Sequence, residues 1–320
     1  MEVTRVSGSA AQSASAIGNN RVILRTEATK DLLVGRDRER HHGFDSLIAI
    51  VRRLVPLIPR DARIFQILFL AALLTTGVLL RDFSLHPLQM ALAFGSGLAT
   101  QAFWLRRLGL EQKGFLSAIV TCCGLSLLLR GDALWVHPLA AAIAMSSKFV
   151  LRINGKHLYN PANLGVVFAI SFLPGTWVSP GQWGNDLAMA VWVLMLGTIV
   201  TTRARRLDVS WVFLGGFLGL VALRVLLLGQ SWAIWWHQLG NGALLLFAFF
   251  MISDPMTIPN RRGTRIAYAL LVAAGAAAWQ YFLFRPNALI WSLFLLTPLV
   301  PLLDRWRPGT RFDWKRPAIG

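Results

Sequence analysis

The sequence predicts an all-α polytopic membrane protein, a helical bundle with about ten hydrophobic spans. Three observations support this fold class. Of the 320 residues, 55% are hydrophobic and only 15% are charged, whereas a soluble domain has about 25% charged residues. The apolar residues fall in blocks of about 17–22 residues, the length with which a helix crosses a hydrocarbon core of roughly 30 Å. Lys and Arg gather at alternate ends of these blocks.

Two segments precede the first apolar block. Residues 1–43 combine Ala, Ser and charged residues, which predicts a disordered, charged N-terminal tail. Residues 44–62 predict a basic amphipathic helix on the inner membrane surface, because apolar residues such as Leu47 and Val51 recur at helical spacing while Arg52 lies off that stripe. The alternative is a helix that docks a cytoplasmic partner.

Residues 63–305 are predicted to form the transmembrane domain, and 306–320 a cytoplasmic C-terminal tail. The predicted spans are 64–80, 86–105, 114–130, 134–151, 161–174, 186–202, 209–228, 232–252, 264–284 and 288–303. The fifth span is short and opens with Pro161, which is typical of a broken or re-entrant helix. Arg224 in the seventh span should face protein, a cavity or the outer headgroups, because an arginine in lipid is costly.

Charges in the loops orient the spans. Sixteen Lys and Arg residues lie in the loops of one side and in the C-terminal tail, and only three lie in the loops of the other side. Because cytoplasmic loops carry the excess of Lys and Arg, the chain is predicted to be a multi-pass protein of the inner (plasma) membrane with both termini cytoplasmic. The net charge of +17 therefore reflects orientation in a lipid bilayer, and no nucleic-acid partner is expected.

Two junctions on the predicted inner side place a polar residue directly before a proline. Asn160 precedes Pro161 between the fourth and fifth spans, and Asp254 precedes Pro255 between the eighth and ninth. Proline lacks a backbone donor and pushes the preceding residue out of the α region, which frees backbone groups at the membrane edge. Such irregular backbone is stable only where it is buried in protein or lines a cavity.

The side chains at these junctions suit a heterocyclic ligand. Asn160 and Asn163 carry amides that donate and accept at once, and Asp254 offers an acceptor or a charge. The alternative is that both junctions are helix caps, since Asn and Asp are favoured N-caps and Pro is favoured at the next position. Two similar junctions on one side favour a shared site.

The two motifs resemble a known family. Asn-Pro-Ala-Asn at 160–163 and Phe-Phe-Met-Ile-Ser-Asp-Pro-Met-Thr at 249–257 are similar to the signatures of the NqrB/RnfD family. These proteins are the membrane subunits of sodium-pumping NADH:quinone reductase and of the RnfABCDGE-type electron transport complex. The resemblance extends over residues 64–305. The segments 177–184 and 301–305 are similar to a stand-alone, RnfD-like branch of the UnbU type.

The resemblance implies a ten-helix subunit of two related five-helix halves that binds flavin and transfers electrons. It implies partners among the other redox-complex subunits or a flavoprotein. It also implies a non-covalent flavin, riboflavin or FMN, at the cytoplasmic side. The expected cofactor-binding residues are Asn160, Pro161, Asn163, Asp254, Pro255 and Thr257. No catalytic residue and no metal ligand is expected.

One departure from the family concerns the loop 174–186, which lacks the Ser/Thr-Gly-Ala-Thr motif that carries covalent FMN in complex-forming members. We therefore expect no covalent FMN, and Thr176 and Ser179 in this loop are interpreted as ordinary turn residues. If the chain takes part in catalysis, we expect a redox subunit without stand-alone catalysis.

Other interpretations stay open at this point. The same pair of broken junctions is typical of a transporter or channel for a small solute or cation, and the N-terminal segment would also suit a scaffold or an export-related accessory protein. His86, His137 and His237 lie near the predicted outer side and could ligate a haem if their helices face each other. Cys122 and Cys123 are interpreted as small buried residues, since neighbours in a helix point about 100° apart.

Overall fold

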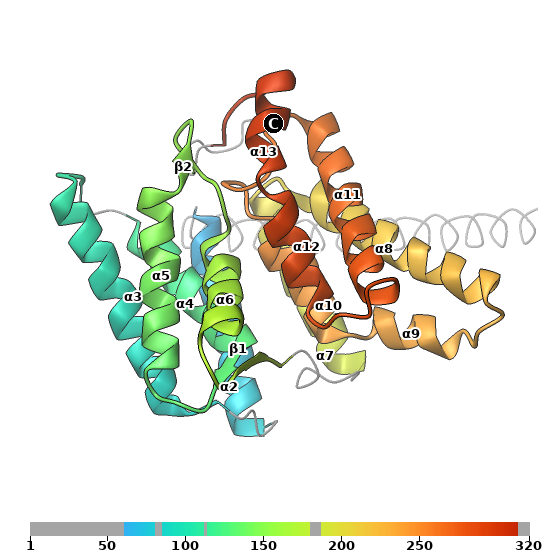
Figure 1. Cartoon of the computed structure of the whole chain (residues 1–320), viewed down its shortest axis with the longest axis horizontal. Coiled ribbons are helices and arrows are strands. Elements are labelled where there is room, and N and C mark those ends of the chain that lie inside the picture. Colours follow the sequence, from blue (N-terminus) through green and yellow to red (C-terminus); the bar gives the residue numbers. More distant parts are fainter. Residues whose placement is uncertain (1–60, 81–84, 112–113, 180–186, 313–320) are drawn as a thin grey trace, which may run out of the picture. The chain divides into compact units, whose positions relative to one another are not determined.

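The computed structural model describes residues 61–80, 85–111, 114–179 and 187–312, which are mostly helical (Figure 1). The predicted N-terminal tail and nearly all of the predicted amphipathic helix lie outside the described residues. The helices are α2 (Ala62–Leu80), α3 (Pro87–Arg107), α4 (Phe115–Leu128), α5 (Val136–Val150), α6 (Pro161–Phe172), α7 (Leu187–Arg203), α8 (Leu207–Leu227), α9 (Ala233–Leu239), α10 (Gly242–Leu246), the π-helix η3 (Phe247–Met251), α11 (Arg262–Tyr281), α12 (Ala288–Leu296) and α13 (Leu299–Trp306).

Each of the ten predicted segments is helical in the structure, with two of them broken. Among the described residues, α8 is a helix long and apolar enough to cross a membrane, and the pair α12 and α13 would count as a second if its 47° bend lies within one span. The all-α class is thus confirmed, while ten spans and two related halves remain predictions.

Proline and polar caps set several helix starts. Pro87 and Pro161 each occupy the first turn of their helix, where a missing backbone N–H costs nothing. At α6, Asn160 is the N-cap, and its side chain accepts a hydrogen bond from the Asn163 backbone N–H. At α10, Asn241 caps Ala243 in the same way. Polar caps therefore divide an otherwise continuous apolar sequence.

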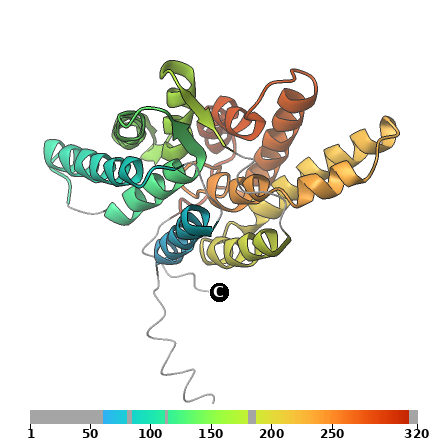
Figure 2. The same ribbon diagram turned by 90° about the horizontal axis from the view of Figure 1, so that it is seen from below.

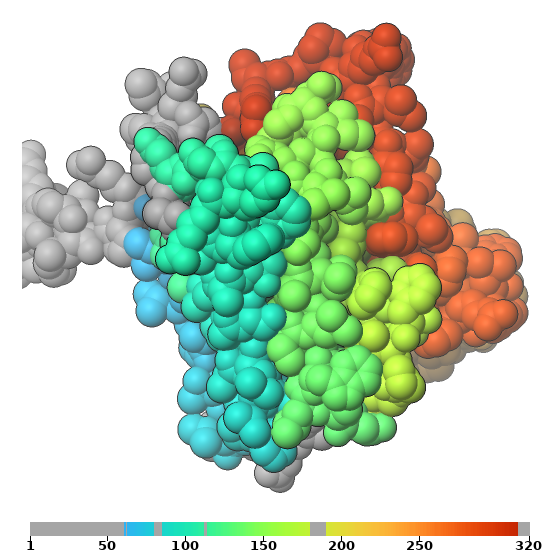
Figure 3. Space-filling model, turned by 60° about the vertical axis from the view of Figure 1, so that its left-hand side comes forward, coloured from blue at the N-terminus to red at the C-terminus, as the bar shows by residue number. Residues whose placement is uncertain are grey.

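Helix packing builds the core. Helices α3 and α5 pack side by side (Figure 3), and α2 lies between α4 and α7 (Figure 2). Helix α11 packs on both α8 and α12. Helix α6 packs on α4 and α5 and also on α12, so it joins a first group of helices (α2 to α5) to a second group (α8, α11 and α12). The buried residues are mainly Ala, Leu, Val and Phe.

Gly165 marks a close approach between α6 and α5. A Cβ atom there would lie 2.9 Å from the Ala144 Cβ and 3.0 Å from the Ala140 carbonyl oxygen. We expect Gly165→Ala to lower the free energy of unfolding by about 1–3 kcal/mol, because an overpacked core must shift backbone or rotamers. Gly219→Ala is the matched control in a helix, since nothing lies within 4 Å of its added Cβ. Thermal unfolding in detergent, followed by tryptophan fluorescence, would contradict the expectation if the two variants behaved alike.

Two short two-stranded sheets connect helix ends. Strands β2 (Arg152–Ile153) and β3 (Lys156–His157) pair across Asn154 and Gly155, which both have positive φ, as a two-residue type I′ turn requires. Strands β1 (Leu129–Gly131) and β4 (Thr176–Val178) pair antiparallel and connect the end of α4 to the segment after α6.

Arg224 faces protein, as predicted. Its guanidinium lies 4.6 Å from the ring centroid of Tyr281 on α11, and its Nη1 donates to the Gln230 side chain. The cation–π contact and the hydrogen bond compensate for the charge of Arg224 in the apolar part of α8.

Candidate functional site

A cavity of about 870 Å³ lies among α2, α3, α4, α5, α6, α7 and η3, and both proline junctions line it. Its apolar part includes Leu70, Val120, Phe249 and Phe250 from α2, α4 and η3. Its polar lining includes Gln101, Ser117, Lys148, Asn160 and Asp254. Ligand sites are typically about 300–1,000 Å³, mostly apolar, with a few convergent polar groups. This cavity has that size and composition.

Asn160 both caps a helix and lines the cavity. Its Oδ1 accepts the Asn163 backbone N–H at 3.1 Å, which is the N-cap bond of α6. Its Nδ2 donates to the Asp254 Oδ2 at 3.3 Å. The two motifs, 94 residues apart in sequence, therefore meet side chain to side chain at the cavity wall.

Asp254 lines the cavity and also fixes a turn. Its Oδ1 accepts the Met256 backbone N–H at 3.0 Å, which fixes the turn after η3. Burial raises the pKa of this carboxyl, and the Met256 N–H and the cations Lys148, Lys156 and Arg206 oppose that rise. The helix-cap interpretation therefore holds for Asn160 and is wrong for Asp254, because the next helix after Asp254, α11, begins only at Arg262.

The cavity lining includes four of the six residues expected to bind a cofactor: Asn160, Pro161, Asp254 and Pro255. Asn163 is 1% exposed and does not line the cavity; its Nδ2 donates to the Ile290 carbonyl on α12. Thr257 is also buried, and its hydroxyl donates to the Asp254 carbonyl at 3.3 Å. These two residues hold the site together rather than line it.

Several polar lining residues were missed by the sequence analysis, and three of them are buried or lie beside the first motif. Lys148 on α5 is 5% exposed, Gln101 on α3 is 3% exposed, and His157 belongs to β3. Lys148 carried a signal, because it is an ionisable residue inside a predicted span, and such residues are rare and functional by default. Gln101 and His157 gave no signal of that kind.

His157 predicts a dependence of stability on acid. Burial, together with Lys148 and Arg152, lowers its pKa to about 3. The unfolded chain takes up a proton near pH 6.5 and the folded chain does not. The contribution of His157 to the free energy of unfolding is therefore fully present above pH 6.5 and is lost as the pH falls toward 3. Between pH 6.5 and pH 5 we expect a loss of about 2 kcal/mol from this group. The His157→Gln variant should lose less over the same interval in thermal unfolding scans, and an identical loss would contradict the assignment.

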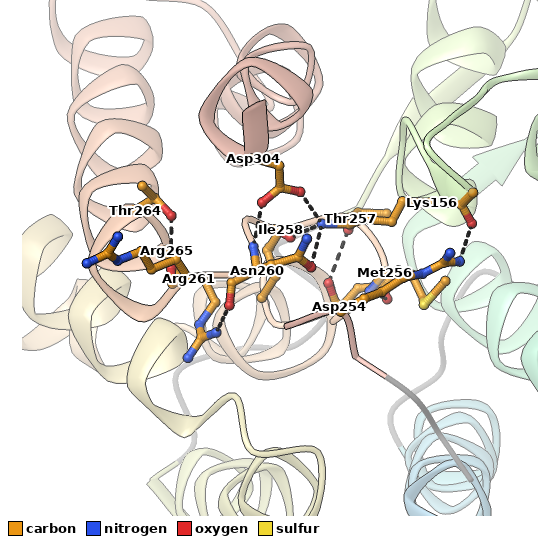
Figure 4. A network of polar contacts seen from close by, with 12 residues as sticks. Lys156, Asp254, Met256, Thr257, Ile258, Asn260, Arg261, Thr264, Arg265 and Asp304 are labelled. Atoms are coloured by element: carbon orange, nitrogen blue, oxygen red, sulfur yellow. Dashed lines mark hydrogen bonds and ion pairs between the residues drawn. The ribbon is translucent and has the colours of Figure 1, made fainter. Parts of the chain in front are cut away.

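A network of polar contacts secures the loop that follows Asp254 (Figure 4). Lys156 on β3 forms an ion pair of 2.8 Å with Asp304 on α13, and its ammonium also donates to the Ile258 carbonyl. Asp304 accepts the Asn260 backbone N–H at 2.7 Å. Burial lowers the pKa of Lys156, and Asp304 opposes that shift. One ion pair thus holds the hairpin that precedes the first motif close to the loop that follows the second motif.

The network continues onto α8 and α11. Arg265 donates to the Asn260 carbonyl at 2.8 Å and forms an ion pair of 2.7 Å with Asp208. Burial and the neighbouring Arg265 lower the pKa of Arg206 to about 10. This end of the protein is therefore held by charged side chains.

The other candidate residues have structural partners. Thr176 lies in strand β4 and not in a turn, which corrects the prediction, and its hydroxyl donates to the Ala169 and Leu173 carbonyls at 2.9 Å. The Nε2 of His137 lies 3.1 Å from the Leu129 carbonyl oxygen. Cys122 and Cys123 are buried free thiols, as predicted.

Comparisons with known proteins support the second of the two motifs. Residues 179–312 match the NQR2, RnfD, RnfE family, and this range contains Asp254 and not Asn160. The D subunit of the ion-translocating oxidoreductase complex of Stutzerimonas stutzeri is 29% identical over 152 residues, which are 46% of this chain and 36% of that protein. The match thus spans about a third of the relative's length. The resemblance to the NqrB/RnfD family is confirmed over residues 179–312, which contain the second motif.

Proposed function

We propose that this relative of the NqrB/RnfD family is a membrane subunit of an ion-translocating oxidoreductase complex that binds a flavin non-covalently in the 870 Å³ cavity. The family match and the name of the relative support a membrane redox subunit. The other subunits of such a complex, or a flavoprotein, would be its electron-transfer partners.

One observation carries the flavin assignment. The two family motifs, on different helices, meet through the Asn160–Asp254 hydrogen bond at the wall of the same cavity. A purely structural pair of caps would need neither a shared cavity nor a contact between the motifs. The convergence supports a ligand that both motifs recognise.

The lining fits an isoalloxazine ring. The Asn160 amide, the Asp254 carboxyl and the Lys148 ammonium provide donors and acceptors for the polar edge of the ring. Phe249 and Phe250 provide an apolar, aromatic wall for its hydrocarbon part. When bound, a flavin supplies one- and two-electron transfer, while the protein supplies position, hydrogen bonds and charge. The Asn160 and Asp254 side chains are already fixed by backbone N–H groups, so they would meet the ring with little loss of conformational freedom.

An absorption spectrum of the purified protein tests the proposal. The expected result is a flavin spectrum whose chromophore is released, unmodified, when the protein is denatured. The Arg107→Met variant should bind flavin like the parent protein, because Arg107 is exposed at the end of α3 and does not line the cavity. Colourless protein that does not bind added riboflavin or FMN would refute the proposal.

Location in the inner membrane with cytoplasmic termini is part of the proposal. Arg107, at the end of α3, and Arg285, in a loop, lie at positions that the charge pattern assigns to the inner and outer sides, and both are exposed. In intact cells, a membrane-impermeant maleimide should label Arg285→Cys, while Arg107→Cys should react only after lysis. The reverse pattern would contradict the orientation.

A transporter or channel for a small solute or cation is the second candidate function. Two breaks favour it: the π-helix η3 that follows α10, and the 47° bend between α12 and α13. Uptake of solute by flavin-free proteoliposomes, lost in the Asp254→Ala variant, would favour this function over the redox one.

A further inference from the structure

Lys148 places a buried positive charge in the wall of the cavity. It lies on α5, two residues from the end of the helix, and is 5% exposed. Removing an ammonium group from water costs several kcal/mol unless opposite charge or good acceptors replace the water. The position is therefore costly for the folded chain when the cavity holds no compensating group.

The protein partners of Lys148 compensate for little of that charge. Its Nζ donates to the Gln101 Oε1 at 3.4 Å and to the Ser117 Oγ at 3.2 Å, and both acceptors are neutral and distant for a charged donor. An ammonium has three donors. Within the part of the chain that the structure describes, no ion pair joins Lys148 to Asp254 or to another carboxylate.

The other cations of the cavity occupy different surroundings. Arg63 is paired with Asp61, and Arg152 is exposed and donates to the Gly155 carbonyl. Lys148, by contrast, shares the wall with buried residues of α3 and α4. A phosphate group would be neutralised by the accessible arginines, whereas a ring system in the buried part of the cavity would meet the Lys148 ammonium.

We infer that Lys148 is the counter-charge for a ligand ring that gains electrons in this cavity. The inference rests on the proposed function and deepens it. The Lys148 ammonium would favour the reduced over the oxidised ring, because two-electron reduction with uptake of one proton leaves a negative charge on the ring. The cavity should thus bind reduced flavin more tightly than oxidised flavin. Lys148 thereby raises the reduction potential of the bound flavin.

The test compares the full-length protein with Lys148→Met, Lys148→Arg and Arg107→Met variants. Bound flavin is quantified after denaturation, and the midpoint potential is measured by titration with dithionite against reference dyes. In Lys148→Met, the affinity for reduced flavin relative to that for oxidised flavin should fall at least about tenfold. This change lowers the midpoint potential by about 30 mV for a two-electron couple. Lys148→Arg and Arg107→Met should remain close to the parent protein.

The outcomes separate this inference from the proposed function. Unchanged potential in a flavin-loaded Lys148→Met protein overturns the role of Lys148 and leaves flavin binding in place. Parent protein that binds no flavin overturns both. If Lys148→Met does not fold, Lys148→Gln replaces it in the same titration. Loss of reduced flavin in Lys148→Met with retention in Lys148→Arg supports the inference, because Lys148→Arg keeps the positive charge that Lys148→Met removes.

Discussion

Replacing Asp304 with alanine is expected to lower the free energy of unfolding by about 3 kcal/mol, the cost of removing one partner from a buried ion pair. The side chains of Asp304 and Lys156 are 13% and 9% exposed, so water replaces little of the lost interaction. The variant also leaves the Asn260 backbone N–H without its acceptor. Chemical unfolding in mild detergent, followed by tryptophan fluorescence, measures the change.

A double variant distinguishes the ion pair from general packing. Lys156→Met combined with Asp304→Leu removes both charges and keeps apolar volume, so it should recover most of the stability lost in Asp304→Ala. Arg262, which is exposed and 3.8 Å from Asp208, provides the surface comparison, and Arg262→Met should change stability by less than about 1 kcal/mol. A loss of similar size in Arg262→Met and Asp304→Ala would show that burial does not determine the effect.

Asp254→Ala is expected to weaken riboflavin binding about 10–100-fold, since hydrogen bonds to charged groups contribute about 1.5–3 kcal/mol each. The change removes the acceptor of the Met256 N–H and the partner of the Asn160 amide. It also removes the carboxyl that interacts electrostatically with Lys148, Lys156 and Arg206. Quenching of riboflavin fluorescence by the purified protein measures the affinity.

Asp254→Asn isolates the charge from the turn. Asparagine can still accept the Met256 N–H, so its binding should lie between those of the parent protein and Asp254→Ala. Circular dichroism confirms that the helices are retained in each variant. Equal riboflavin affinity in all three proteins would remove Asp254 from the site.

Most helix boundaries could be predicted because prolines, caps and charged loops lie where the helices end. Pro161 begins α6, basic residues lie in the last turns of α3 and α7, and further arginines follow α7, as the sequence indicated. The interruption at Asn241 was not predicted, since a single polar residue in an apolar run gives a weak signal until its cap bonds are seen. The hairpin at Asn154 and Gly155 could have been recognised, because Asn-Gly is a strong turn signal.

The residues that line the cavity could be predicted only in part, and the reason is physical. A motif shows which residues matter and does not show which direction their side chains take. Asn163 belongs to the first motif, yet its amide faces α12. Lys148 belongs to neither motif, yet it lines the cavity, because α5 brings it beside α3 and α4. Such contacts depend on helix packing, which periodicity alone does not determine.

The two ends of the first group of helices are fastened by different kinds of bond. At one end, β1 and β4 share a backbone ladder, extended by the Asp132 N–H bonded to the Gly175 carbonyl at 3.0 Å. At the end that carries Asn160 and Asp254, charged side chains make the fastening. Added salt screens exposed charges more than buried ones and leaves amide-to-carbonyl bonds almost unaffected. Rising ionic strength should accordingly speed amide hydrogen exchange around Arg262, whose ion pair with Asp208 is exposed, before it does so at Leu129, so that local opening begins at the end of the protein that carries the charges.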